Sequence, residues 1–545
     1  MTDAQEVPLR IFAAFAGGGA KGIVHVGALK ALEEQDVQFC GVAGTSAGAI
    51  VASLKAAGFT ASEIVSDGDD ILTRIRQVDP SIAKLTDLFG PRGWLILRAF
   101  RWIAGSPVWL GRLLGGLLIL LLPASFILGG KLGYPAVCWI AGAWLTFLLA
   151  AWLVWREFSS GLVRLETLRG VLGKLLNRQL FPNDPDRVVC MRDFGHSGRP
   201  SLKIVSSNLT NRSLYLFSPE KTPDVAVADA VIASICIPGL FEAHQIGNDL
   251  HVDGGLVSNL PAWPFDEERE LDPDALTIAF EITENKPEAP VRGKKWIRAA
   301  IKTALFGSGE LNLRANGRSE LVELRTDIGV LDFDLTKEQM LKAVADADAA
   351  ASKRLVERVT TIPNIYRKAC EATRQSFETL FESQPTLLKG GRRRGHVRVA
   401  LAIRDPQYFQ SLRLRYGAGY RGHTDERLLL PIEGTIVGQA WAERVPQFAM
   451  TEALEKYGID AFVDTYRRSL VWRELEWILC VPISKEEAED PLFVVIVDGN
   501  APLAVGPGEP EEDTLDAFRE ALENILHNFE NVLVELDTVE NGQSR

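Results

Sequence analysis

The chain of 545 residues is too long for a single compact core, so we expect two or three domains. Its formal net charge of -12 argues against general attraction to nucleic acid, and the sequence carries no nucleic-acid motif. The six cysteines form no Cys-x-x-Cys pair and no zinc-like cluster, which suits reduced thiols in a cytosol-facing protein and gives no reason to expect a metal or another cofactor.

The chain opens with a polar, acidic segment and then a strand-loop-helix pattern. Residues 1–6 lack the basic and apolar regions of a secretory signal. Residues 9–16 form a short apolar run that predicts a buried strand. The glycine-rich loop at 17–22 follows it, and residues 23–34 carry apolar side chains at helical spacing.

The glycine loop fits Gly-x-Gly-x-x-Gly, so a dinucleotide-binding fold is one alternative. That fold needs an acidic ribose ligand at the end of the next strand, but here the strand runs into Ser46. A phosphate-binding P-loop also fails, because Lys21 is followed by Gly22 rather than by serine or threonine. We therefore predict an oxyanion hole, in which bare backbone N–H groups approach a reacting carbonyl, and a plain turn is the structural alternative.

The second loop, residues 44–48, has the sequence Gly-Thr-Ser-Ala-Gly between an apolar run and a helix-like run. This pattern is typical of a nucleophile elbow, in which Gly44 and Gly48 relieve crowding around an exposed serine. The N-terminus of the following helix favours negative charge developing beside the serine. Ser46 is the first catalytic candidate, and a structural turn is the alternative.

Residues 113–155 are uncharged except for Lys131, and the two apolar stretches on either side of it are long enough to span a bilayer. We expect an inserted hairpin of two transmembrane helices. Arginines flank both outer ends, which by the positive-inside rule places both ends on the cytoplasmic side. The alternatives are a pair of buried core helices or a monotopic hairpin in one leaflet.

Asp253 follows a short strand and precedes Gly254 and Gly255. An aspartate before two glycines is most often a turn residue. A hydrolase triad would place a histidine after the aspartate, but the next one is His396, beyond a predicted domain boundary. A Ser46–Asp253 dyad is therefore the simpler prediction, and burial would raise the basicity of its carboxylate.

Three blocks together resemble the patatin-like phospholipases, bacterial type. They are the glycine loop with Lys21 and Gly22, the elbow around Ser46, and the turn with Asp253, Gly254, Gly255, Asn259 and Pro261. The resemblance covers about residues 9–353. It implies a three-layer α/β sandwich and a metal-free Ser46–Asp253 dyad that hydrolyses acyl esters of lipids. It also implies an oxyanion hole formed by Gly17, Gly18, Gly19 and Ala47. The hydrophobic hairpin departs from the family pattern.

The remaining chain divides into a connector, residues 354–395, and a C-terminal module, residues 396–545. The connector is helical in pattern and ends in a linker with three arginines. In the module, residues 434–440 predict a turn into a helix and residues 480–483 the end of a strand. On these two blocks the module resembles a GAF domain of α+β type, although the signature of cyclic-nucleotide-binding members is absent. In the last helix, apolar residues form a heptad seam that predicts a homodimer, or packing on the module's own sheet, and these residues are Leu515, Phe518, Leu522, Ile525, Phe529, Val532 and Leu536.

The leading hypothesis is a membrane-anchored lipid acyl hydrolase with phospholipase A or lysophospholipase activity. Its partners would be membrane lipids, and both domains would face the cytoplasm. A sensor or scaffold with a vestigial hydrolase domain is one alternative, and a lipid transacylase that uses the same residues is another. A basic amphipathic stretch at 292–306 suits either anionic headgroups or an ordinary solvated helix face.

Overall fold

The computed structural model divides into two compact units, Met1–Leu355 and Val356–Arg545, which are described separately. Helix α13, Lys337–Arg358, contains the point of division. The second unit therefore includes the segment that the sequence analysis assigned to a connector. The structure describes residues 9–35, 37–68, 70–105, 144–145, 161–272, 275–285, 303, 319–389, 395–405, 408–420, 423–426, 428–450, 469–484, 490–504 and 512–542.

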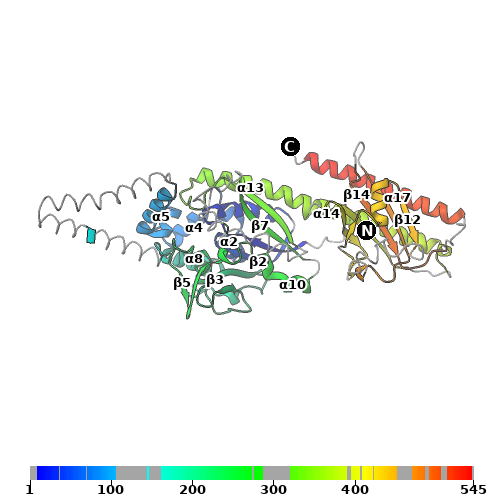
Figure 1. The fold of residues 1–545 in the computed structure, drawn as a ribbon. Coiled ribbons are helices and arrows are strands. Elements are labelled where there is room, and N and C mark those ends of the chain that lie inside the picture. The colour runs from blue at the N-terminus through cyan, green and yellow to red at the C-terminus, as the bar shows by residue number, and fades with distance from the viewer. Residues whose placement is uncertain are drawn as a thin grey trace, which may run out of the picture. The chain divides into compact units, whose positions relative to one another are not determined.

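The first unit is built on a mixed sheet with the strand order β5-β6-β3-β2-β1-β7-β8, and β4 pairs with β3 (Figure 1). Strands β3, β2, β1, β7 and β8 run parallel, whereas β4, β5 and β6 are antiparallel to their neighbours. The strands are β1 Leu9–Phe15, β2 Val37–Thr45, β3 Ser201–Asn208, β4 Ser213–Phe217, β5 His244–Ile246, β6 Asp249–Asp253, β7 Leu276–Glu284 and β8 Ser319–Thr326.

Central strands of this sheet are apolar along almost their whole length, because helices cover them. Residues 11–15 of β1 are all buried. Helices α2 and α9 pack on β3, and α1 packs on β7 and β8. The helices of this unit are α1 Val24–Glu33, α2 Ala47–Ala56, α3 Ala61–Ile64, α4 Ile71–Val78, α5 Gly90–Gly105, α8 Glu166–Leu180, α9 Val227–Ile235, α10 Asp266–Leu271 and α13. The predicted α/β class is confirmed.

The predicted transmembrane hairpin is not supported. Among the residues that the structure describes, no helix is both long enough and apolar enough to cross a bilayer. Helix α5 has 16 residues, fewer than the roughly 20 that a spanning helix needs, and the longer α13 and α14 (Thr361–Ser383) carry charged side chains. This finding overturns the inserted hairpin and the membrane localisation derived from it. Residues 113–155 lie outside the described part of the chain, apart from 144–145.

Two other predicted features also fall where the structure gives no description. They are the basic stretch at 292–306, apart from residue 303, and the three arginines at 392–394.

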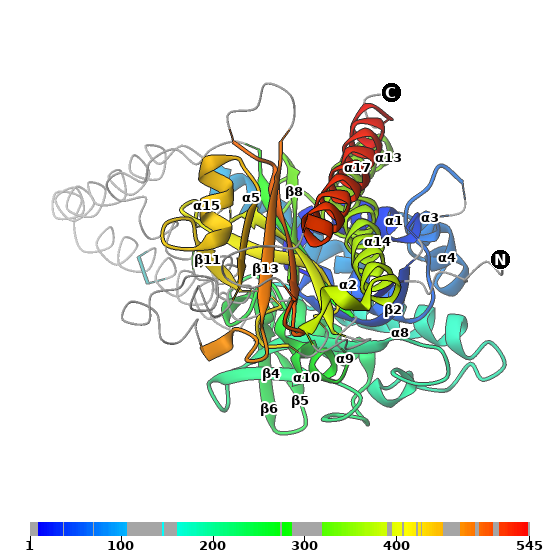
Figure 2. The ribbon, with the colours of Figure 1, turned by 90° about the vertical axis from the view of Figure 1, so that its right-hand side faces the viewer.

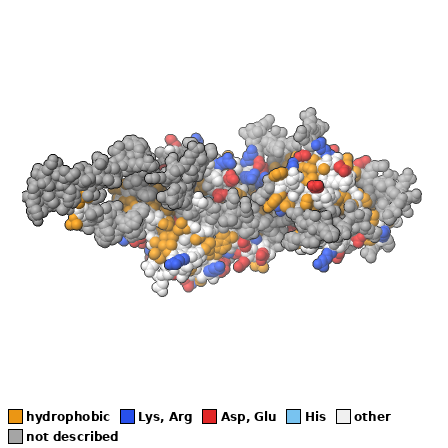
Figure 3. Space-filling model, in the orientation of Figure 1, with side chains coloured by type: hydrophobic (Ala, Val, Ile, Leu, Met, Phe, Trp, Pro, Cys, Tyr) orange, Lys and Arg blue, Asp and Glu red, His pale blue; other side chains and the backbone are white. Residues whose placement is uncertain are grey.

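On the face shown in Figure 3, basic and acidic side chains are interspersed over the coloured, described surface. Such mixing of signs is typical of a solvated protein surface.

The second unit contains one antiparallel sheet with the order β11-β10-β9-β14-β13-β12. Helices α14 and α17 lie on one side of β13 and α15 on the other (Figure 2). The bounds are β9 Val397–Arg404, β10 Ser411–Ala418, β11 Leu429–Pro431, α15 Ile436–Glu443, β12 Gln447–Met450, β13 Trp477–Ile483, β14 Phe493–Gly499 and α17 Glu512–Gly542.

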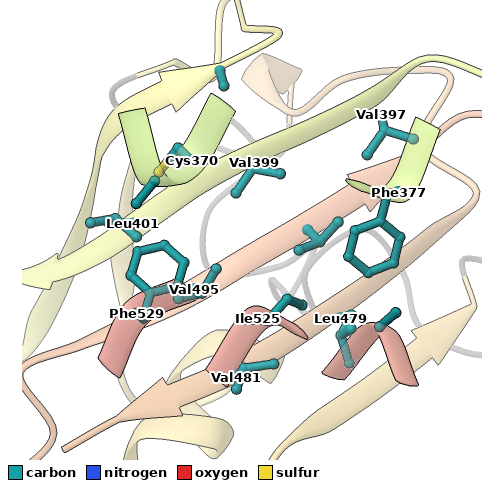
Figure 4. Packing of buried hydrophobic residues seen from close by; sticks show 14 of the residues in the cluster. Cys370, Phe377, Val397, Val399, Leu401, Leu479, Val481, Val495, Ile525 and Phe529 are labelled. Carbon is teal, nitrogen blue, oxygen red and sulfur yellow. The ribbon is translucent and has the colours of Figure 1, made fainter. Parts of the chain in front are cut away.

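Alternation along the strands gives this sheet two apolar faces. On β9, Val399 and Leu401 face α14 and α17, whereas Ala400 and Ala402 face the core that contains α15. Figure 4 shows the first of these cores, where Phe377 of α14 and Phe529 of α17 lie over the strands. A strand with two buried faces gives a continuous apolar run in the sequence, as residues 399–403 do, and Arg398 before them is a buried charged exception.

The predicted heptad seam of α17 is buried within its own unit. Its members with described side chains, Leu522, Ile525, Phe529, Val532 and Leu536, all belong to or pack against the core between α14, α17 and the sheet. This is the alternative in which the helix packs on its own domain's sheet. The homodimer stays a prediction.

Candidate active site

Ser46 occupies the turn between β2 and α2, where the sequence predicted a nucleophile elbow. Its backbone lies at φ 53° and ψ -123°, and residues other than glycine rarely adopt such a positive φ. The flanking glycines are required by close packing. A Cβ at Gly44 would lie 2.3 Å from the Gly48 carbonyl oxygen, and one at Gly48 would lie 2.1 Å from the Phe15 carbonyl oxygen. The strand, the turn and the helix can therefore come this close only with glycine at both positions.

The structure brings Ser46 and Asp253 together although 207 positions separate them in the chain. The Ser46 hydroxyl donates a hydrogen bond to Asp253 Oδ2 at 2.6 Å. The Gly255 N–H donates to the other carboxylate oxygen at 2.7 Å, and this bond fixes the orientation of the carboxylate. Asp253 ends β6, and β6 pairs with β3 next to β2, so the topology of the sheet brings the two side chains to the same edge.

Both members of this pair are buried, Ser46 at 5% and Asp253 at 3% relative exposure. Burial raises the pKa of Asp253 to about 6, against the opposing effects of the hydrogen bonds from Ser46 and Gly255. A carboxylate with a raised pKa is a stronger base than an ordinary aspartate. It remains ionised at neutral pH and is in hydrogen-bond contact with the hydroxyl from which it would take a proton.

The predicted oxyanion loop lies directly beside the elbow. A Cβ on Gly17 would lie 3.1 Å from the Ser46 Cβ, and one on Gly22 would lie 2.4 Å from the Ala47 Cβ. The Gly17 N–H donates to the Asn259 carbonyl at 3.0 Å, so this member of the predicted set is already engaged. Asn259 thus supports the loop through its main chain.

For the other three members of the predicted set, no hydrogen bond from the main-chain N–H is found to the described residues. Gly18 precedes and Gly19 begins the short helix η1, Gly19–Ile23, and Ala47 begins α2. The first N–H groups of a helix have no hydrogen-bond partner within that helix. Gly19 lies at φ +56°, and a Cβ there would lie 2.4 Å from the Val330 carbonyl oxygen, so only glycine fits. These N–H groups and the N-terminus of α2 favour negative charge beside Ser46.

The glycine loop at 17–22 is anchored by two contacts that were not predicted from the sequence. The Ala20 N–H donates to the Val330 carbonyl at 2.8 Å. Lys21, predicted only as part of the motif, forms a 2.7 Å ion pair with Glu284 at the end of β7, and its side chain is 8% exposed. No local spacing relates the loop to Val330 or Glu284, so the sequence carried no signal for either contact.

Histidines do not complete a triad within the described residues. The hydrogen bonds of the Ser46 hydroxyl and the Asp253 carboxylate join these groups to each other and to Gly255. His25 is fully buried, donates from Nε2 to the Ala16 carbonyl at 2.8 Å and packs against Phe15. Burial lowers its pKa to about 4, so it is neutral. His25 is therefore a packing residue.

Gly254 and Thr45 hold the turn that carries Asp253 in place. Gly254 lies against β3, where a Cβ would be 2.3 Å from the Val205 carbonyl oxygen. The Thr45 hydroxyl donates to the Ser258 carbonyl at 2.9 Å and so ties the elbow to the segment after Asp253.

Among the described residues, no group of three or more histidine, cysteine, aspartate or glutamate side chains could hold a metal ion.

Comparison with known proteins finds a family model that matches the part of the chain containing this site. Residues 13–266 match the family described as patatin-like phospholipase. The uncharacterized protein YqhO of Bacillus subtilis is 28% identical over 353 residues, which cover 61% of this chain and 92% of that protein. An uncharacterized NTE family protein of Mycobacterium tuberculosis is 37% identical over 98 residues, which cover 18% of this chain and only 26% of that protein.

Solved structures give weaker likenesses. VipD from Legionella pneumophila covers 69% of this chain and 77% of its own, with 16% identity and a TM-score of 0.32. A GAF domain region from Geobacter sulfurreducens covers 31% of this chain and 99% of its own, with 16% identity and a TM-score of 0.21. Neither likeness carries an argument at these values, and the GAF-like prediction is not confirmed.

Proposed function

We propose that this lipid ester hydrolase, whose residues 13–266 are a patatin-like phospholipase domain, works through a Ser46–Asp253 dyad. The observation that carries the proposal is the 2.6 Å hydrogen bond from the Ser46 hydroxyl to a buried Asp253 carboxylate. Ser46 is held in a strained turn beside backbone donors, and Asp253 is oriented by the Gly255 N–H. This arrangement suits nucleophilic attack on an ester carbonyl.

The proposed reaction has two halves. In the first, the Ser46 oxygen bonds to the ester carbonyl carbon while its proton passes to Asp253. The negative charge on the carbonyl oxygen is stabilised by the N–H groups of Gly18, Gly19 and Ala47. The tetrahedral intermediate collapses, the alcohol leaves with the proton from Asp253, and an acyl-serine remains. In the second half, water attacks the acyl carbon, Asp253 accepts its proton, and Ser46 regains a proton as the fatty acid leaves.

The substrate class that we propose is phospholipids or lysophospholipids, because the family match is to patatin-like phospholipases. Incubating the purified protein with mixed phospholipids and neutral lipids, followed by mass spectrometry of the products, tests this proposal. Release of free fatty acid and lysophospholipid supports it. Release from neutral lipids alone would contradict the substrate class, and transfer of the acyl chain to another lipid would identify a transacylase.

We also propose that the C-terminal unit regulates the hydrolase. The support is that α13, whose Asp348 forms a 2.6 Å ion pair with Lys30 of α1, continues to Arg358 in the second unit. A chain that ends at Arg358, before α14, tests the proposal by its specific activity and by its response to cell extract. A truncated protein that keeps both unchanged would remove the regulatory role.

Activity should depend on pH through Asp253. Because its pKa is raised to about 6, the carboxylate accepts the Ser46 proton only above that pH. We expect kcat/KM for a soluble ester to reach a plateau above about pH 7 and to fall about tenfold per unit below pH 6. A profile that is flat down to pH 5 would contradict an aspartate base with this pKa.

The ionised Asp253 carboxylate should lower the free energy of unfolding of the first unit at neutral pH. The folded state holds the Asp253 proton more tightly than the unfolded state, so ionisation between about pH 4 and 6 disfavours folding. We expect Asp253→Asn to raise the free energy of unfolding of the first unit by about 1–3 kcal/mol at pH 7.5, with little gain at pH 4. Urea unfolding at both pH values checks this expectation. An equal gain at both would show that the effect is not ionisation.

A further inference from the structure

The backbone of Ser46 is held by a side chain that lies outside the three predicted motifs. The Ser46 N–H donates a hydrogen bond to the Ser234 hydroxyl at 2.9 Å, and that hydroxyl donates to the Val205 carbonyl at 2.6 Å. Ser234 lies near the end of α9 and is fully buried. Its single hydroxyl thus satisfies a donor on the elbow and an acceptor on β3.

This bond matters because Ser46 does not have the backbone conformation of the strand before it or of the helix after it. Ser46 follows the last residue of β2 that pairs with β3, Thr45, and its N–H bonds to a side chain, because a buried N–H needs a partner. Ser234 supplies that partner from a separate helix. The strained conformation of a catalytic residue persists only where its surroundings fix it, and this hydrogen bond is one such constraint.

The end of α9 also contacts the other member of the dyad. The Asp253 N–H donates to the Cys236 carbonyl at 2.9 Å, two residues after Ser234. The Val205 carbonyl, which accepts from Ser234, lies against Gly254, next to Asp253. Residues 234–236 therefore hold the main chains of both Ser46 and Asp253.

Helix α9 is itself anchored away from the site. Asp229 in its first turn receives hydrogen bonds from Arg169 of α8, one of them at 3.1 Å, and contacts His244 Nε2 of β5 at 2.9 Å. These partners lower the pKa of Asp229 to about 2, against the opposing effect of burial, so it stays ionised across the working pH range. The helix that carries Ser234 is thus fixed at its other end.

We propose that Ser234 is a positioning residue of the Ser46–Asp253 dyad, whose hydroxyl fixes the elbow so that the Ser46 oxygen meets the Asp253 carboxylate. The inference rests on the proposed function, since it assigns Ser234 a role in the same reaction. The Ser234 hydroxyl is fully buried and bonds to main-chain groups of Ser46 and Val205, so it acts through Ser46. Its effect is expected on kcat, because misplacing a nucleophile weakens the reacting geometry more than substrate binding.

The test compares Ser234→Ala with Ser53→Ala in the full chain. Ser53 is a matched control, because it is equally buried on α2 but its hydroxyl bonds, among the described residues, to the Ile50 carbonyl of the same helix, at 2.8 Å. We expect Ser234→Ala to lower kcat on a soluble ester about 10- to 100-fold with KM changed less than about threefold. Labelling by a fluorophosphonate should slow in parallel. Ser53→Ala should stay within about twofold of the unmodified protein in both assays.

Equal kcat for the two variants, at matched folded fraction, would overturn the proposal. If Ser234→Ala does not fold, Ser234→Cys decides, because a thiol of similar size is only a weak hydrogen-bonding group. It should fold and lose about tenfold in kcat, and full activity of this variant would contradict the role of the hydroxyl. An unmodified protein without esterase activity would remove the proposed function and this inference together. An active protein that loses activity in Ser46→Ala but not in Ser234→Ala would remove this inference alone.

Discussion

Replacing Ser46 with alanine is expected to lower kcat/KM for ester hydrolysis by at least about 10³-fold, because no acyl-serine can form. Asp253→Asn should lower kcat/KM by a similar factor, since the amide that replaces the carboxylate 2.6 Å from the Ser46 hydroxyl cannot act as a base. The double variant should be no worse than Ser46→Ala alone, because the two side chains act as one unit. Initial rates on a soluble ester and on phospholipid, with circular dichroism to confirm folding, make the measurement.

Asp249→Asn is the matched control for the aspartate. Asp249 lies on the same strand, β6, and accepts a hydrogen bond from the Asn208 side chain at 3.0 Å rather than from Ser46. We expect its hydrolysis rate to stay within about twofold of the unmodified protein. Turnover in folded Ser46→Ala would end the proposed mechanism. A normal rate in Asp253→Asn would require another base.

Replacing Arg398 with methionine should destabilise the second unit by about 3–5 kcal/mol, because it strands two buried carboxylates. Arg398 is fully buried on β9 between Asp425 and Asp498, with nitrogen–oxygen distances of 2.9 and 2.6 Å. Its guanidinium also lies over the rings of Tyr420 and Trp472, at 4.1 and 4.2 Å. Thermal unfolding of the full chain should show a lowered transition for this unit.

Arg404→Met provides the control on the same strand. Arg404 pairs with Asp490 at 2.7 Å, but its side chain is 43% exposed, and an exposed ion pair contributes about 1 kcal/mol or less. Adding Asp425→Asn and Asp498→Asn to Arg398→Met should restore part of the stability, because the stranded charges disappear. If Arg398→Met behaved like Arg404→Met, the buried network would contribute little to the fold.

The sequence was informative where chemistry follows from local spacing. Ser46 and Asp253 each lie at or just after the end of a predicted strand and beside glycines, so their loops could be recognised without knowing which strands pair. The predicted oxyanion loop also lies next to the elbow. Its member Gly17, however, is used by Asn259, and only the folded backbone reveals which N–H groups are free to bind an oxyanion.

Contacts between distant segments left no signal in the sequence. Ser234 was not among the predicted site residues, and its hydroxyl accepts a hydrogen bond from an N–H 188 positions away. The Arg398 network likewise joins residues on separate strands and loops. The error over the transmembrane hairpin has a different cause. The hairpin was predicted from the uncharged length of residues 113–155 and from the arginines that flank them, whereas no described helix is both long and apolar enough to cross a bilayer.

The central claim is that Ser46 is a nucleophile activated by Asp253, and covalent trapping tests it most directly. The intact protein would be treated with a fluorophosphonate, and the modified residue located by peptide mass spectrometry. We predict one adduct, on Ser46, that forms much more slowly in Asp253→Asn and is absent in Ser46→Ala. An adduct on another serine, or labelling that persists in Ser46→Ala, would contradict the account.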